Sequence, residues 1–205
     1  MDIDTQHKDD PKVEQPSQTS TWKAVVKEIF IFAVIAFGVV LPFRMYIAEP
    51  YIVSGTSMDP TFATGNYLIV DKISSTAKHP PRNAVIVFEF PLPIKGEEGK
   101  NLIKRVIGIP GDTVTMSNNV ITITNAENPN GFVLEQPYLV YPAQSLFTVT
   151  LKADEYFVMG DNRPVSYDSR AWGVLPARFI VGRPLVQLYP FSDMGIWPGM
   201  SSLRK

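Results

Sequence analysis

The chain has 205 residues, of which 45% are hydrophobic and 19% charged, and its formal net charge is −1. This length suffices for one sizeable core, or for one domain with a small appendage. The balanced charge disfavours a protein that binds nucleic acid through its phosphates. The sequence has no cysteine and two histidines, which excludes disulfides and thiol catalysis and leaves little material for a metal site.

The first 21 residues are predicted to form a disordered tail. They contain five acidic residues, two lysines, two prolines and few apolar residues. Such a segment cannot bury enough apolar surface to offset the entropy lost on ordering.

Residues 22–47 are predicted to form a transmembrane anchor. The uncharged run 29–43 reaches only ~22 Å as a helix, short of the ~30 Å hydrocarbon layer. The span grows when the apolar residues from Trp22 onward join it and flanking lysines extend to the interface. Pro42 is expected to kink or end this helix. A buried soluble helix, a cleaved secretory signal and an interfacial helix are the alternatives. The anchor is favoured because the run has no polar face and no small-x-small pattern follows it before Glu49.

The orientation of this anchor follows from its flanking charges. Four lysines precede the apolar run and only Arg44 closely follows it. The positive-inside tendency then places the tail in the cytoplasm and the chain after residue 47 outside the membrane. We therefore expect a single-pass membrane protein whose domain lies outside the cytoplasm, which for a bacterium means the periplasm or the outer face of the membrane.

Residues 48–205 are predicted to form a mainly β domain with antiparallel strands. Short runs rich in β-branched and aromatic residues alternate with Gly, Pro, Asn and Asp clusters, and no strong amphipathic helix separates them. Ser117, Asn118 and Asn119 indicate a hairpin turn. The expected strands lie at 67–73, 84–90, 102–109, 114–124, 145–152 and 155–160.

Two segments carry the residue types of a nucleophile and a base. In 53–62, Gly55 and Pro60 bracket a tight turn that can expose Ser57, although a Ser/Thr-rich turn with no function is the alternative. In 101–112, Lys104 shares one strand face with Leu102 and Val106. If that face is buried, desolvation lowers the pKa of the lysine and lets its neutral amine act as a base. A solvent-facing lysine on an edge strand is the alternative.

A third segment, 159–173, crowds charged, amide and small residues into one loop. Asp168 and Arg170 can pair there, and Ser166 can bond a lysine amine; a surface loop closed by salt bridges is the alternative. The loop does not match a calcium-binding pattern. His79, flanked by prolines, is a rival base with no supporting carboxylate motif around it.

These segments occur in an order that resembles bacterial type I signal peptidases, a family of serine–lysine dyad proteases. The resemblance covers about residues 22–183 and includes the anchor in front of the first motif. It is carried by Ser57-Met58-Asp59-Pro60-Thr61, by 65–72, by 104–112 and by the loop from Gly160-Asp161-Asn162-Arg163 to Asp168-Ser169-Arg170.

The resemblance implies a role for each matched residue. Ser57 would be the nucleophile, Lys104 the general base and Ser166 the group that orients the lysine amine. The backbone N–H of Ser57 would form one arm of the oxyanion hole. The second arm falls at Gly55, which has no hydroxyl, so that a backbone N–H would replace it. The structural ion-pair residues would be Asp161, Asp168 and Arg170.

The resemblance also implies small substrate pockets lined by Val53, Met58, Phe62, Leu102 and Ile103. Such pockets would accept Ala, Gly or Ser before the cleaved bond and exclude larger side chains. Two residues depart from the family pattern, namely Pro164 and Phe62. The short spacing between Lys104 and Ser166 leaves room only for a small inserted β-subdomain at about 113–152.

The expected function is therefore that of a membrane-anchored signal peptidase I, a hydrolase that needs no cofactor and binds no metal. Its partners would be signal peptides of exported preproteins, the lipid bilayer and the export translocon. Apolar residues near the C-terminus, from Tyr189 to Trp197, are expected either to dock on lipid or to close the β core. A maturation peptidase for one narrow substrate and a catalytically silent binding domain are the two alternative functions.

Overall fold

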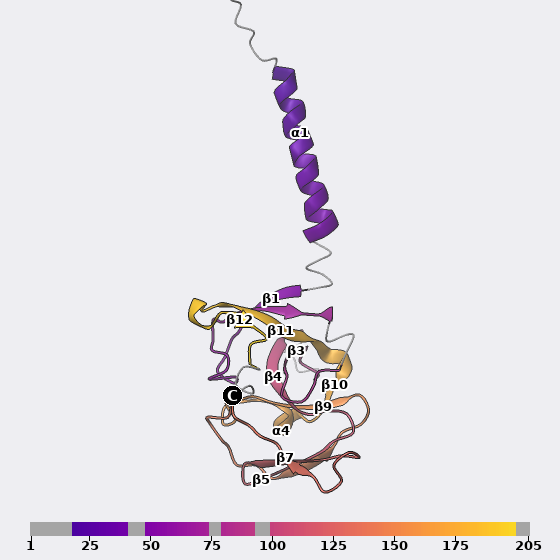
Figure 1. Cartoon of the computed structure of the whole chain (residues 1–205), viewed down its shortest axis with the longest axis vertical. Helices are drawn as coiled ribbons and strands as arrows, with labels where there is room; N and C mark the ends of the chain where they lie inside the picture. The colour runs from indigo at the N-terminus through magenta and orange to yellow at the C-terminus, as the bar shows by residue number, and fades with distance from the viewer. Residues whose placement is uncertain (1–17, 41–47, 74–78, 93–98, 200–205) are drawn as a thin grey trace, which may run out of the picture. The chain divides into compact units, whose positions relative to one another are not determined.

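The computed structural model describes residues 18–40, 48–73, 79–92 and 99–199. The chain divides into two compact units at Phe43 and Arg44, and each is described by itself. In the first unit, α1 (Gln18–Ile35) continues into a π-helical turn, η1 (Ala36–Val40) (Figure 1). The helix begins four residues before the boundary expected at residue 22, and most of the expected tail and Pro42 lie outside the described residues.

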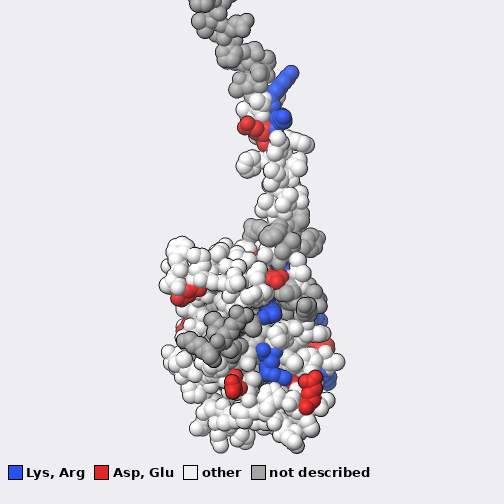
Figure 2. Space-filling model, in the orientation of Figure 1, with Lys and Arg blue, Asp and Glu red and all other residues white. Residues whose placement is uncertain are grey.

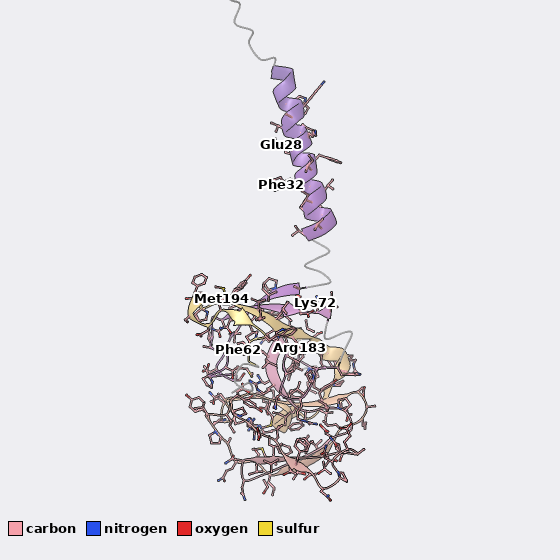
Figure 3. The ribbon with its side chains drawn as sticks, viewed as in Figure 1. Glu28, Phe32, Phe62, Lys72, Arg183 and Met194 are labelled. Atoms are coloured by element: carbon pink, nitrogen blue, oxygen red, sulfur yellow. The ribbon has the colours of Figure 1, made fainter. Side chains whose placement is uncertain are left out.

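The described part of α1 is strongly apolar and exposed. Its side chains project outward, as Phe32 does at 78% exposure (Figure 3). No helix within residues 18–40 or the other described ranges meets the length and hydrophobicity needed to cross a membrane.

The second unit contains a large antiparallel sheet of eight strands (Figure 1). The strand order is β1-β2-β11-β3-β4-β9-β10, and β12 pairs with β11. The strands are β1 (Ala48–Ile52), β2 (Tyr67–Asp71), β3 (Val85–Glu89), β4 (Asn101–Gly108), β9 (Glu155–Met159), β10 (Leu175–Pro176), β11 (Ile180–Tyr189) and β12 (Gly195–Ile196).

A second, four-stranded sheet occupies the stretch for which the small β-subdomain is expected. Its order is β7-β6-β5-β8, from β5 (Thr113–Ser117), β6 (Val120–Thr124), β7 (Phe132–Val133) and β8 (Phe147–Thr150). Ser117 pairs with Val120, and Asn118 and Asn119 between them have φ angles of 49° and 67°. Positive φ at both loop residues defines a type I′ turn, so the hairpin expected at this point is present.

The mainly β antiparallel fold expected from the sequence is confirmed, but the longest strand, β11, was not expected. Its interior holds Gly182 and Pro184, which weaken a strand pattern. The structure accommodates Pro184 beside a shift of register between Pro184 and Val186. Added Cβ atoms at Gly182 would lie 2.2 Å from the Asp71 carbonyl oxygen, so only glycine lets β11 approach β2 this closely.

Strand β4 lies at the centre of the core because both of its faces are buried. The five residues Lys104–Gly108 are all buried. On one side Ile107 packs with the four-stranded sheet, and Val106 packs with Ile86 and Val158 in a second cluster. A position this deep in the core desolvates whatever polar group β4 carries.

The remaining described elements are short: α4 (Ser169–Trp172), η2 (Ala177–Phe179) and η3 (Phe191–Asp193). Acidic and basic side chains are interspersed on the visible face of the domain, without a basic stripe (Figure 2). Phe62 lies among the packed strands, whereas Met194 lies at the edge near β12 (Figure 3). Tyr189, Phe191, Met194 and Ile196 are exposed, so they do not close the β core.

Candidate active site

The site is built around a contact between Ser57 and Lys104. Lys104 Nζ lies 2.7 Å from Ser57 Oγ and 2.9 Å from the carbonyl oxygen of Ile103. Only 3% of Lys104 is exposed. Strand β4 therefore places the Lys104 amine, shielded from water, within hydrogen-bond distance of the Ser57 hydroxyl. A general base and the nucleophile that it activates require this arrangement.

Burial makes this lysine a usable base. Desolvation lowers the pKa of Lys104 from 10.5 to about 8, while the negative charges of Asp168 and Asp161 act in the opposite direction. A substantial fraction of the amine is then neutral just above neutral pH, so that it can accept a proton. The alternative of a solvent-facing lysine is wrong, because Lys104 points into the core.

The turn that presents Ser57 is held by hydrogen bonds that its backbone carbonyl groups accept. Gly55 adopts φ of 93°, and its carbonyl accepts a bond of 2.9 Å from Thr64 Oγ1. Asn162 binds the carbonyl groups of Thr56 and Ser57. Its backbone N–H donates to the Ser57 carbonyl (3.0 Å) and its Nδ2 to the Thr56 carbonyl (3.1 Å). Sequence reasoning placed Asn162 in the motif but assigned it no role.

Ser166 lies close to this turn without bonding to Lys104. Its Oγ is buried and has no hydrogen-bond partner within the described residues. The proximity is shown by Gly160, where an added Cβ would lie 2.3 Å from Ser166 Oγ and 2.4 Å from the Ser57 carbonyl oxygen. Gly160 therefore permits the loop of Ser166 and the turn of Ser57 to meet.

Asp168 and Arg170 form one of the ion pairs behind the site. Arg170 Nε lies 2.8 Å from Asp168 Oδ1, and Asp168 is completely buried. Asp168 also accepts from the backbone N–H of Gly160 (3.0 Å) and caps the N-terminus of α4 through the N–H of Arg170. This carboxylate thus ties both ends of the 160–170 loop together.

Asp161 pairs with a different arginine. The expected set of ion-pair residues contained only Arg170 as the cation, yet Asp161 bonds to Arg105 at 2.6 and 2.8 Å. Arg105 follows Lys104 on β4, and its side chain leaves the strand on the other face. Thr61 Oγ1 donates to Asp161 at 2.5 Å, so this pair also anchors the end of the nucleophile turn.

A pocket of about 110 Å³ opens beside the Ser57–Lys104 pair. Three of the residues for which the resemblance implies a pocket role, Val53, Leu102 and Ile103, line it. Met58 and Phe62 do not: both are buried in a core cluster with Leu68 and Val85, beneath the turn. The lining residues that the sequence did not predict are Tyr51 and Ile52 of β1, Ser54 after it, Leu68 of β2, Val87 of β3 and Asn101 of β4.

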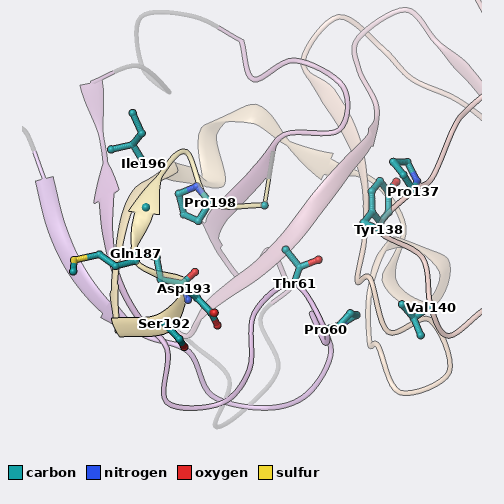
Figure 4. Close-up of a pocket in the computed structure, with 13 residues that line it drawn as sticks. Pro60, Thr61, Pro137, Tyr138, Val140, Gln187, Ser192, Asp193, Ile196 and Pro198 are labelled. Carbon is teal, nitrogen blue, oxygen red and sulfur yellow. The ribbon is translucent and has the colours of Figure 1, made fainter. Parts of the chain in front are cut away.

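A larger cavity of about 650 Å³ lies elsewhere in the domain (Figure 4). Thr61 is at its centre, with Tyr138 and Val140 on one side and Gln187 and Asp193 on the other (Figure 4). Ser57 and Lys104 do not line it, so it is separate from the dyad.

His79, the rival base of the sequence analysis, is not the group that binds Ser57. His79 is exposed and its ring is tilted against that of Tyr156, with 6.2 Å between the ring centroids. The Ser57 hydroxyl instead forms a hydrogen bond with the lysine amine. Within the residues that the structure describes, no group of three or more His, Cys, Asp or Glu could hold a metal ion.

Comparison with known proteins gives the family. The family description "Signal peptidase, peptidase S26" matches residues 25–189. The chain is 33% identical over 190 residues to "Probable signal peptidase I-2" of Synechocystis sp., covering 90% of this chain and 81% of the relative. It is 34% identical over 189 residues to "Signal peptidase I" of Leptolyngbya laminosa, covering 90% and 88%. With "Signal peptidase I P" of Bacillus subtilis subsp. natto the identity is 35% over 173 residues, covering 78% and 87%. Given the matched length and these identities, the chain belongs to the signal peptidase family, peptidase S26.

Proposed function

We propose that this protein is a membrane-anchored serine endopeptidase that removes N-terminal signal peptides from exported preproteins, with Ser57 as nucleophile and Lys104 as general base. The observation that carries the proposal is the 2.7 Å contact between Lys104 Nζ and Ser57 Oγ in a water-shielded site. Membership of the signal peptidase family supports the substrate class.

The reaction needs only groups of this chain and water. The neutral amine of Lys104 accepts the hydroxyl proton as Ser57 Oγ bonds to the carbonyl carbon of the substrate. The oxyanion would be held by the backbone N–H groups of Ser57 and Gly55. The ammonium then gives its proton to the leaving amine, and the peptide C–N bond breaks. Water, deprotonated by the same lysine, hydrolyses the acyl-enzyme and releases Ser57.

Ser166 is assigned the role of orienting the lysine. Its buried hydroxyl has no hydrogen-bond partner within the described residues and lies near the Ser57 turn. A buried unpaired hydroxyl is costly, and Lys104, once protonated, has a spare N–H to donate. The ion pairs Asp161–Arg105 and Asp168–Arg170 support the two loops that carry Ser57 and Ser166.

The pocket beside the dyad suits small side chains before the cleaved bond. Its volume of about 110 Å³ and its apolar walls would accept Ala, Gly or Ser and exclude larger residues by overpacking. This is the physical basis for cleavage after a small-x-small motif.

We assign the protein to the bacterial inner membrane, with its N-terminus in the cytoplasm and its catalytic domain outside. The support is the apolar run beginning in α1 and the lysines that precede it. A signal peptide has its own hydrophobic segment in the bilayer, so a protease tethered beside the bilayer meets it there. The export translocon would supply these substrates.

The test is cleavage of a preprotein panel by the full chain in detergent or vesicles. We expect cut sites after small-x-small motifs, and loss of cleavage in both Ser57→Ala and Lys104→Ala. An exposed lysine provides the control: Lys152→Ala, 81% exposed at its side chain, should retain activity. Full activity of Lys104→Ala would refute the dyad. Cleavage of one precursor alone would indicate a narrow maturation peptidase, and failure to react with a serine-directed acylating inhibitor would indicate a silent binding domain.

A further inference from the structure

The inference concerns the side of the nucleophile that faces away from the substrate pocket. Every residue that lines the 110 Å³ pocket lies between Tyr51 and Lys104. Under the proposed function, the residues before the cleaved bond occupy this pocket. The chain after the cleaved bond must then leave over the other neighbours of Ser57.

Those neighbours are the Asn162 side chain and the segment bonded to it. Asn162 donates to the carbonyls of Thr56 and Ser57, so its side chain points at the nucleophile turn. Tyr141 forms a parallel β-bridge with Asn162, and its carbonyl oxygen accepts from the N–H of Arg163. Tyr141 is therefore held in register with the residue that fixes the nucleophile.

The direction of the Tyr141 side chain follows from this register. Paired residues of a ladder project their side chains to the same face, and consecutive residues project to opposite faces. By this pattern the Tyr141 side chain leaves the backbone on the same face as the Asn162 side chain, whose Nδ2 donates to the Thr56 carbonyl. Its neighbour Val140 lines the 650 Å³ cavity, which Tyr141 does not line.

The Tyr141 ring is also available to a ligand. It is 47% exposed, while the backbone groups of Tyr141 hold the loop together. A half-exposed aromatic side chain offers apolar contact area with little loss of conformational entropy on binding.

We infer that Tyr141 forms a specificity surface for the first two residues after the cleaved bond, and that it favours aromatic or large aliphatic side chains there. The inference rests on the proposed function. In this arrangement Ser57 lies between two binding sites. The small pocket selects the signal-peptide residues before the cleaved bond, and the exposed apolar surface contacts the first residues of the mature chain.

The test uses two peptide substrates with one signal sequence, which differ only in the two residues after the cleaved bond, Phe-Phe or Gly-Gly. We expect the wild-type kcat/KM to be about fivefold higher for the Phe-Phe substrate, the ratio that one apolar contact of moderate strength supplies. Tyr141→Ala should bring this ratio close to one, because it lowers kcat/KM for the Phe-Phe substrate about fivefold more than for the Gly-Gly substrate. Tyr141→Phe, which keeps the ring, should preserve the ratio.

The control is Val133→Ala, an exposed apolar residue of β7 in the four-stranded sheet, which should not change the ratio. A wild-type ratio near one, or an equal loss for both substrates in Tyr141→Ala, overturns the inference and leaves the proposed function intact. Absence of cleavage of both peptides by the wild-type chain overturns the proposed function, and the inference with it.

Discussion

Arg105 forms an ion pair with Asp161 through two hydrogen bonds, of 2.6 and 2.8 Å, and neither side chain is exposed to water. Arg105 follows the proposed base on β4, and Asp161 begins the loop that carries Asn162 and Ser166. Arg105 also donates to the carbonyl oxygens of Asn83 and Gly199. One guanidinium thus joins four separate segments of the chain behind the dyad.

Arg105→Ala should therefore destabilise the domain strongly. Removing one partner of a buried ion pair leaves an uncompensated charge, which costs about 3 to 5 kcal/mol. Urea unfolding of the full chain measures this loss. The exposed pair Lys152–Glu155 provides the comparison, since Lys152→Ala should cause little change. An Arg105→Ala variant as stable as Lys152→Ala would contradict the assigned role of the buried pair.

The pH dependence of activity should follow the protonation state of Lys104. Because desolvation lowers the pKa of Lys104 to about 8, the neutral amine that accepts the Ser57 proton is lost as the pH falls below that value. We expect kcat/KM to rise with pH and to level off above about pH 8. Steady-state kinetics on one preprotein across this range measures the profile. A rate that stays constant down to about pH 6 would show that another group is the base.

Burial of Lys104 should also lower the free energy of unfolding in a pH-dependent way. The pKa of Lys104 is depressed in the folded state, so between about 8 and 10.5 the unfolded chain binds more protons and the wild type gains stability as pH rises. Lys104→Met lacks this titration. At each pH, the free energy of unfolding of the wild type is subtracted from that of Lys104→Met. We expect this difference to be about 3 kcal/mol larger, in favour of Lys104→Met, at pH 7 than at pH 10.5.

Chemical unfolding of both proteins at the two pH values isolates this difference, because groups common to both cancel. Packing lost or gained with the methionine also cancels between the two pH values. An identical difference in the free energy of unfolding at both pH values would mean that Lys104 titrates normally in the folded protein.

The sequence alone predicts the parts of this site that depend on neighbouring residues, but not the contacts between residues far apart in the chain. Ser57 and Lys104 stand in local motifs that suggest their chemistry, and the Asn118-Asn119 hairpin follows from turn preferences. The ion-pair partner of Asp161 could not be predicted from the local sequence. Arg105 is 56 residues away, whereas Arg170 is close in the sequence and was therefore the expected cation. Phe62 next to a motif looks like a pocket residue, yet the turn directs it into the core.

Gly160→Ala tests whether the turn of Ser57 and the loop of Ser166 must approach each other this closely. No positive φ is needed there, so the backbone itself tolerates alanine. The obstacle is contact: the added Cβ would lie 2.3 Å from Ser166 Oγ and 2.4 Å from the Ser57 carbonyl oxygen. Either the Ser166 side chain or the nucleophile turn must move, and a shift of about 1 Å at reacting groups costs about a hundredfold in rate.

We therefore expect Gly160→Ala to fold but to lose most of its kcat, with a smaller change in KM, when cleavage of one preprotein is followed. Gly195→Ala is the matched control, since its added Cβ meets nothing closer than an Asp193 oxygen at 4.0 Å, and it should behave as the wild type. If Gly160→Ala retained full kcat, the turn of Ser57 and the loop of Ser166 could separate without consequence. The close approach of these two segments would then not be a requirement of catalysis.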